Sequence, residues 1–235
     1  MNNSVKSIVK KVFPLTINQR YDKQTKRIMK IVLEDESTFI DVGSHKGEVL
    51  DEALKISKKG KHFAFEPIPD LFEKLHDKYG SHCEILNCGL SDQKKQSSFQ
   101  YVTSNPAYSG IRRRTYPKNE EIQTIQIQLD TLDNQLKLHD RVDLIKIDVE
   151  GFELDVLMGL SQKVGIISFE FTSEFFDQTT KCLKYLKNLG YEEFNFSIGE
   201  RRKFFSKWSN TEDLIRKLRN EIRNDKLLWG DIYCK

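Results

Sequence analysis

The segment Asp143-Leu-Ile-Lys-Ile-Asp-Val-Glu-Gly-Phe-Glu153 decides the fold more than any other stretch of the chain. Its apolar residues, together with Val142 before them, predict a buried strand over 142–148. The spacing of the apolar residues over 154–160 predicts a helix. Asp148 and Glu150 stand where the strand ends. Ligands of open α/β sheets bind outside the carboxyl ends of the strands. Because buried acids are costly without a partner, two carboxylates there indicate chemistry rather than packing.

The same arrangement occurs earlier in the chain, in Thr38-Phe-Ile-Asp-Val-Gly-Ser-His-Lys-Gly47. A strand over 38–42 carries Asp41 near its end, and a helix is expected over 47–57. A strand, an acid, a glycine-rich turn and a helix together form the usual cradle for a cofactor.

The remaining chain alternates between strand and helix patterns. Further helices are predicted at 69–78, 179–189 and 211–224, and further strands at 61–66, 83–87, 97–102, 122–129, 164–171, 191–197, 203–207 and 231–234. A β-α-β-α order predicts an α/β fold, with a mostly parallel sheet covered by helices on both faces.

The composition is that of a soluble globular protein. The 235 residues are 38% hydrophobic and 31% charged, and the net charge of +3 is too small to indicate a nucleic-acid partner. No apolar run approaches the ~20 residues that span a bilayer, and lysines interrupt the N-terminal segment, so neither stable membrane insertion nor a signal peptide is expected. The four cysteines form no C-x-x-C pair, which favours reduced thiols and a cytoplasmic protein.

We predict two parts of the chain. Residues 1–35 form a basic N-terminal extension, in which Val5 to Val12 could build one apolar helix face opposite lysines. This helix could contact a membrane surface or a partner, but packing across the edge of the domain is favoured because the stretch is short and lacks Trp. Residues 36–235 form the main domain, with an insertion at about 97–129. The oligomeric state is not predicted.

The first turn does not match a dinucleotide fingerprint, because its glycines are four positions apart and the first is missing. Asp41 would repel a pyrophosphate, whereas it suits a ligand with ammonium and hydroxyl groups, such as the methionine part of S-adenosylmethionine. The alternative is a glycine turn that serves packing only. The residues of this turn that we expect to contact the cofactor are Asp41, Gly43, Ser44, His45 and Gly47.

Two later turns complete the predicted cofactor site. Glu66 lies near the spacing at which an acid binds ribose hydroxyls, and an adenine face could rest on Pro67 or Ile68. Alternatively, Glu66 caps the helix that begins near residue 69. Ser91 and Asp92 could accept from the adenine amine, although Ser-Asp is also an ordinary turn signal.

These segments together resemble the FkbM family of S-adenosylmethionine-dependent methyltransferases. The resemblance spans residues 38–160, and Lys146-Ile-Asp-Val-Glu-Gly151 is its most specific part. It is carried by 39–47, 65–69, 87–92, 129–133, 145–153 and 156–159.

The resemblance implies a Rossmann-like class I methyltransferase fold with a seven-stranded sheet, whose last strand, 230–234, is antiparallel. It also implies S-adenosylmethionine as cofactor, with S-adenosylhomocysteine as product. The implied reaction is methylation of a hydroxyl on a sugar of a glycan, glycolipid or secondary metabolite.

Asp148 and Glu150 are the predicted catalytic residues, because a hydroxyl must lose its proton during methyl transfer. Asp148 could also contact the cofactor ammonium. The alternative is that both acids only hold loops and cap a helix. Lys146 is expected to pair with a carboxylate. Asp148, Glu150 and Glu170 could supply oxygen ligands to a divalent metal, but no histidine has metal-binding spacing to them and a metal is not predicted.

The acceptor is expected beside the loop over 103–117. Tyr108 and Tyr116 could stack on a sugar, and Arg112 and Arg113, in a run that ends at Arg114, could hold a phosphate on the acceptor. Glu170 is a further candidate at the same edge. A solvated basic loop is the alternative.

Two other functions stay open. The chain could methylate RNA or protein, although the base-amine signature of aromatic and proline residues is absent after residue 148. It could also be a non-catalytic cofactor-binding or adaptor protein. Intact acids and glycines at each expected cofactor position argue against that. A nicotinamide dehydrogenase is least favoured, because the pyrophosphate glycine pattern fails.

Overall fold

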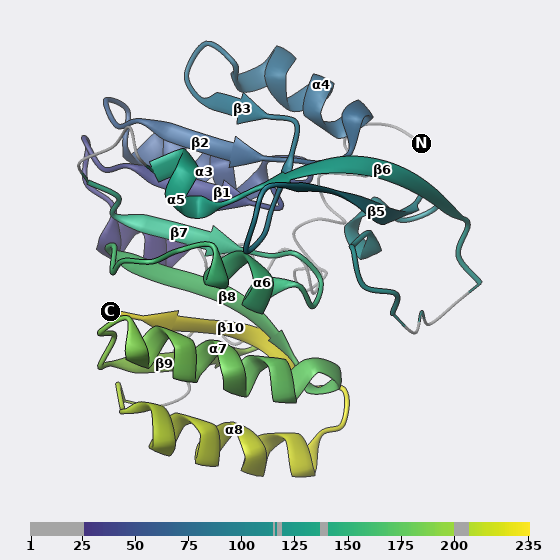
Figure 1. Ribbon diagram of the computed structural model, residues 1–235. Helices are drawn as coiled ribbons and strands as arrows, with labels where there is room; N and C mark the ends of the chain where they lie inside the picture. The colour runs from purple at the N-terminus through teal and green to yellow at the C-terminus, as the bar shows by residue number, and fades with distance from the viewer. Residues whose placement is uncertain (1–25, 115, 117–118, 137–140, 200–206) are drawn as a thin grey trace, which may run out of the picture.

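A seven-stranded sheet forms the centre of the molecule (Figure 1). The computed structural model describes residues 26–114, 116, 119–136, 141–199 and 207–235. The strand order is β3-β2-β1-β7-β8-β10-β9. The first five strands are parallel, and β10 runs antiparallel to both β8 and β9. The strand bounds are β1 Phe39–Val42, β2 His62–Phe65, β3 Glu84–Leu86, β7 Leu144–Ile147, β8 Ile166–Thr172, β9 Phe194–Ile198 and β10 Trp229–Cys234.

Helices cover both faces of this sheet, as the alternating pattern predicts. One apolar cluster joins the sheet to α3 and α4 and to a helix at residues 26–32; the other joins it to α6, α7 and α8. Strand β1 serves both clusters, since Phe39 faces one and Ile40 the other. The helix bounds are α3 Glu48–Ile56, α4 Pro69–Tyr79, α5 Leu132–Leu136, α6 Glu153–Met158, α7 Phe176–Asn188 and α8 Thr211–Asn224.

A smaller sheet lies at the carboxyl end of the main one (Figure 1). Its order is β4-β6-β5, from β4 (Gly89–Leu90), β5 (Lys95–Val102) and β6 (Ile122–Asp130). β5 and β6 pair antiparallel from Lys95↔Leu129 to Val102↔Ile122. Phe99 and Ile127 pack this sheet against Ile68 and Leu71, at the start of α4. The connection between β5 and β6, including the short 3₁₀ helix Pro106–Tyr108, is therefore held over the ends of the main strands.

The main elements agree with the sequence-based expectations. The structure adds β4, α5 and the helix at residues 26–32, which were not predicted, and it moves the ends of several other elements. Helix α7 begins at Phe176, because the 3₁₀ turn Ser173–Phe175 leads directly into it. His62 is buried in β2, where its Nε2 lies 2.7 Å from the Ser57 carbonyl oxygen.

Some expectations keep the status of predictions. The helix at Val5–Val12 and most of the strand at 203–207 lie outside the described residues. The limits of the extension, the main domain and its insertion stay predictions too. The four cysteines are free thiols, as expected. Within the described ranges, every helix is too short or too polar to cross a membrane.

Candidate active site

A large cavity opens at the carboxyl ends of β1, β2, β7 and β8. Its volume is about 1160 Å³, somewhat above the ~300–1,000 Å³ of typical small-ligand sites. The first turn (41–46), the end of β2 (65–68) and the loop after β7 (148–150) line it. The connection between β5 and β6 and the residues preceding β10 line it as well. A cavity of this volume has room for two ligands.

The first turn brings a buried carboxylate to the cavity. Asp41 is 3% exposed, and its Oδ2 has no hydrogen-bond partner among the described residues. Ser44 Oγ donates instead to the Asp41 carbonyl oxygen, over 3.0 Å. Burial raises the pKa of Asp41 to about 7, and the neighbouring Lys146 opposes that rise. This carboxylate is placed to receive a cationic or hydrogen-bond-donating ligand.

The glycines of this turn serve two different purposes. Gly43 has a φ of 85°, and a Cβ there would lie 2.0 Å from the Asp148 carbonyl oxygen, so only glycine lets the first turn approach the loop after β7. Gly47 does not line the cavity. It begins α3 with a φ of 76°, and a Cβ there would collide with Tyr79 and Leu75. Gly47 therefore serves packing, as the alternative interpretation of this turn proposed, whereas Gly43 is part of the cavity wall.

Glu66 ties the first two turns together. Its Oε2 accepts from the His45 N–H at 2.8 Å, and its Oε1 accepts from the Ile68 N–H at 2.9 Å. Ile68 is the cap residue of α4, so the capping alternative holds in part. Burial raises the pKa of Glu66 to about 7. Each carboxylate oxygen can accept a second hydrogen bond, so the ribose contact stays a prediction at a residue that does line the cavity.

Ser91 and Asp92 are not brought to the cavity. Ser91 Oγ donates to Asp92 Oδ1 at 2.8 Å, and Lys95 Nζ binds the same oxygen at 2.9 Å. The preceding residues, Gly89 and Leu90, line the cavity in their place. Ser91 and Asp92 therefore form an ordinary turn in this structure, which was the alternative interpretation. Gly89 and Leu90 are the residues of this segment that could contact an adenine.

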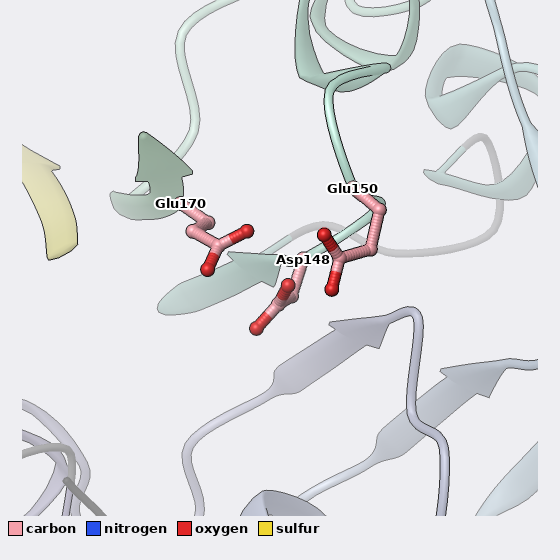
Figure 2. A group of neighbouring side chains, drawn as sticks. All are labelled: Asp148, Glu150 and Glu170. Carbon is pink, nitrogen blue, oxygen red and sulfur yellow. The ribbon is translucent and has the colours of Figure 1, made fainter. Parts of the chain in front are cut away.

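Three acids converge at the carboxyl ends of β7 and β8 (Figure 2). One carboxylate oxygen from each of Asp148, Glu150 and Glu170 lies within 4.8 Å of the others. Glu170 comes from β8, and the other two come from the loop that follows β7. The sequence placed all three at this edge, but it did not show that they meet.

Two cations already balance part of this cluster. Buried Lys146 binds Asp148 Oδ2 and Asp231 Oδ1, both at 3.1 Å, which confirms the expectation that it pairs with a carboxylate. The Arg114 guanidinium pairs with Glu150 and lies 3.6 Å from Glu174. A divalent ion would have to compete with both cations, so the acids alone do not define a metal centre.

The loop that carries Glu150 has a strained backbone. Glu150 has a φ of 55°, in the left-handed region that side chains with a Cβ rarely adopt. Glu153 holds the loop, because its Oε1 accepts from the Val149 N–H at 3.3 Å and from the Gly151 N–H at 3.1 Å. Strain of this kind persists where surrounding contacts determine the conformation, and it clusters at functional sites. Sequence reasoning assigned no role to Glu153; its position three residues after Glu150 was the available signal.

The structure changes which arginine reaches the cavity. Arg112 donates to Asp155 Oδ2 at 3.0 Å and lies over the Phe152 ring, while Arg113 is exposed. Neither lines the cavity, so neither is placed to hold an acceptor phosphate there. Arg114 is the arginine that does line it. The direction of each side chain in an irregular loop cannot be predicted from three identical residues in a row, so the sequence could not show which arginine reaches the cavity.

Other polar atoms in the cavity wall lack partners in the described part of the chain. They are Asp41 Oδ2, His45 Nε2, Tyr116 Oη and Thr172 Oγ1. Tyr108 and Tyr116 also line the cavity, with ring centroids 6.1 Å apart and an interplanar angle of 30°. Buried polar atoms in folded proteins nearly always have partners, so this wall is built for polar ligands.

The sheet order, its antiparallel β10 and the cavity at the strand ends define a Rossmann-like class I methyltransferase fold. The family model described as the methyltransferase FkbM domain matches residues 41–193, more than half of the chain. The chain therefore belongs to the FkbM methyltransferase family, and the resemblance read from its sequence is confirmed.

Two curated relatives are similar to parts of the chain. The hexuronic acid methyltransferase AglP of Haloferax volcanii is 29% identical over 153 residues, covering 64% of this chain and 61% of AglP. The AMB antimetabolite synthetase AmbE of Pseudomonas aeruginosa is 27% identical over 167 residues, covering 55% of this chain but 8% of AmbE. The chain thus spans less than two thirds of either relative.

Among solved structures, the fold is similar to that of a precorrin-6y C5,15-methyltransferase from Geobacter metallireducens. The TM-score is 0.50 at 14% identity, and the match covers 92% of this chain and 88% of the other. At this identity the likeness concerns the fold alone, and it agrees with the sheet order described above.

Three buried acids predict that the unliganded protein loses stability as the pH rises. Burial raises the pKa of Asp41, Glu66 and Glu153 to about 7 each. Between the ordinary acid pKa and 7 the folded state binds more protons than the unfolded state, so the free energy of unfolding falls with rising pH. Each group contributes about 1.4 kcal/mol over this range, so we expect a loss of about 4 kcal/mol between pH 6 and pH 8, and a melting temperature lower by about 8–16 °C.

Differential scanning fluorimetry at the two pH values tests this expectation. Glu153→Gln should weaken the pH dependence, because it removes one titrating group while keeping an acceptor oxygen for the loop N–H groups. A melting temperature that is equal or higher at pH 8 would contradict the burial argument.

Proposed function

We propose that this protein is an S-adenosylmethionine-dependent O-methyltransferase that methylates a hydroxyl of a sugar in a glycan, a glycolipid or a secondary metabolite. The observation that supports it most is the partnerless Asp41 carboxylate oxygen, in the same cavity as a cluster of three acids. The family and the printed name of AglP, a hexuronic acid methyltransferase, favour the same reaction class.

The cofactor side of the cavity consists of the first two turns. Asp41 would hold the ammonium group, and His45 and the backbone of Gly43 and Ser44 would hold the carboxylate. Glu66 would bind the ribose hydroxyls, because each of its oxygens can accept a further hydrogen bond, and Ile68 and Leu90 would contact the adenine. When bound, S-adenosylmethionine supplies an electrophilic methyl group on a cationic sulfur.

The acceptor side consists of the connection between β5 and β6 and the acid cluster. Tyr108 and Tyr116 present aromatic surface and a hydroxyl to a sugar ring. A hydroxyl proton would pass to the acid cluster, which contains the predicted catalytic residues Asp148 and Glu150 together with Glu170. The chain's own contribution is mostly alignment, since an acceptor oxygen must lie behind the methyl carbon, in line with sulfur.

The charge of the cavity favours an acceptor without phosphate. Seven carboxylates line it, against four lysine and arginine side chains, and Arg114 and Lys146 are engaged with acids. An acidic wall attracts a cationic cofactor and repels a phosphate-rich ligand, which disfavours RNA as the acceptor. A cytoplasmic location is part of the proposal.

Calorimetric titration with S-adenosylmethionine and S-adenosylhomocysteine, with NAD as control, tests this function. We expect saturable binding of both adenosyl ligands in the micromolar range and none of NAD. Transfer of a labelled methyl group to neutral sugars, uronic acids and RNA then identifies the acceptor class. Folded protein that binds neither adenosyl ligand, with or without magnesium, would overturn the proposal in favour of an adaptor. Binding without methyl transfer to any of these acceptors would overturn the sugar assignment.

A further inference from the structure

The three acids of the cluster differ in their cationic partners. Asp148 is bound by Lys146 and Glu150 by Arg114. Glu170 has no cationic partner within 4.0 Å in the described part of the chain, although it lies within 4.8 Å of the other two carboxylates. A carboxylate that is paired with a cation is a weaker base than one that is not. The geometry therefore separates Glu170 from the two acids that the sequence favoured as bases.

The surroundings of Glu170 are mostly acidic. Asp231 lies opposite it in the β8–β10 register, Asp148 and Glu150 follow β7, Glu153 begins α6, and Glu174 lies in the turn after β8. Among the described cations that line the cavity, Lys146 and Arg114 pair with these acids, each shared between two of them, and Lys46 and Lys226 also line it. Burial first, and then the charges of Asp148 and Glu153, raise the pKa of Glu170 well above its ordinary value. The surroundings of Glu170 therefore favour its protonated form more than those of an ordinary carboxyl group do.

We propose that Glu170 is the catalytic residue that takes the acceptor's proton, and that the cationic cofactor favours its ionised form. This inference rests on the proposed function and names the base within it. A cation bound beside an acid cluster favours the ionised carboxylate. Binding of the methyl donor would thus increase the fraction of Glu170 that is ionised and able to act as a base.

The step balances in atoms and in charge. The acceptor oxygen bonds to the methyl carbon, the carbon–sulfur bond breaks with its electron pair on sulfur, and the hydroxyl proton passes to Glu170. The positive charge on sulfur and the negative charge on Glu170 disappear together, so the net charge of the site does not change. In a cavity of low polarity, a step that leaves no uncompensated charge avoids a large electrostatic cost.

Proton release on binding provides the test. Calorimetry at pH 7, in buffers of different ionisation enthalpy and with EDTA present, measures the protons released with each ligand. We expect S-adenosylmethionine to release more protons than S-adenosylhomocysteine, which has no sulfonium charge. Glu170→Gln should remove this difference, and Glu192→Gln, the same change at an exposed position, should keep it. Equal release by both ligands, or a difference that persists in Glu170→Gln, would overturn the inference.

The wild-type comparison decides even if Glu170→Gln does not fold. Loss of binding of both ligands to folded wild-type protein would overturn the proposed function itself, whereas binding without the proton difference would overturn only the role of Glu170. If the two ligands differ in proton release only when magnesium replaces EDTA, the role of Glu170 would also be overturned, because a metal ion would then be bound by the acid cluster. With an acceptor from the screen, Glu170→Gln should lower kcat by about 100-fold or more and leave the KM for S-adenosylmethionine nearly unchanged. An unchanged kcat would contradict the assignment.

Discussion

Asp41→Asn is expected to weaken the binding of S-adenosylmethionine and S-adenosylhomocysteine by about 100-fold, because both ligands carry the ammonium group that we assign to this carboxylate. Removing one partner of a buried charge pair costs about 2–5 kcal/mol. This cost applies to Asp41 because it is 3% exposed and its Oδ2 has no hydrogen-bond partner among the described residues. Asparagine keeps the shape of the side chain, so the variant should fold.

The pH dependence gives the same prediction a second readout. Since burial raises the pKa of Asp41 to about 7, its proton must leave before an ammonium group can bind. The wild-type affinity should therefore rise between pH 6 and pH 8, and this rise should be weaker in Asp41→Asn. Calorimetry measures both, with Asp77→Asn on the exposed face of α4 as control. Wild-type affinity in Asp41→Asn would contradict the cofactor assignment and favour an adaptor.

Lys146→Met is expected to reduce the free energy of unfolding by about 3–5 kcal/mol, which is the usual cost of removing one member of a buried ion pair. Lys146 is 2% exposed and binds both Asp148 and Asp231, the latter 1% exposed. Methionine fills a similar volume, so the loss reflects the two carboxylates that no longer have their cation. Denaturant unfolding measures the effect.

Two further variants separate charge from packing. Lys187→Met removes an exposed lysine that pairs with Glu212 on α8, and it should cost at most about 1 kcal/mol. In Lys146→Met, the additional change Asp231→Asn should restore part of the lost stability, because it removes one of the uncompensated charges. A double variant no more stable than Lys146→Met would show that the loss comes from packing instead.

Much of the fold was readable because its signals are local. Buried strands such as 144–147, the helix pattern over 211–224 and the acid-glycine turn at 41–47 each depend on residues close together in sequence. The periodicity of a segment reports which of its faces is buried, so the order of strands and helices follows. Element ends were less readable: α7 starts at Phe176 without a side-chain cap that would mark it.

The site was readable only in part, for a geometric reason. Asp41, Glu66, Asp148 and Glu150 end or follow strands, and parallel strands bring their carboxyl ends to one edge, so their common location follows from the pattern. Ser91, Asp92, Arg112 and Arg113 lie outside the cavity, and Arg114 lies in it. These positions depend on how irregular connections are held above the sheet, and no periodicity describes that.

The sequence by itself determined the family, the order of strands and helices, and the acids at the edge of the sheet, because each of these depends on local pattern. Only the tertiary structure decided the electrostatics of the site. Lys146 binds Asp231, far along the chain in β10, while Glu170 stands among acids without a cation of its own in the described residues. Charges interact through space over a few ångströms, so the pairing of each acid is set by which strands become neighbours and how closely their ends approach.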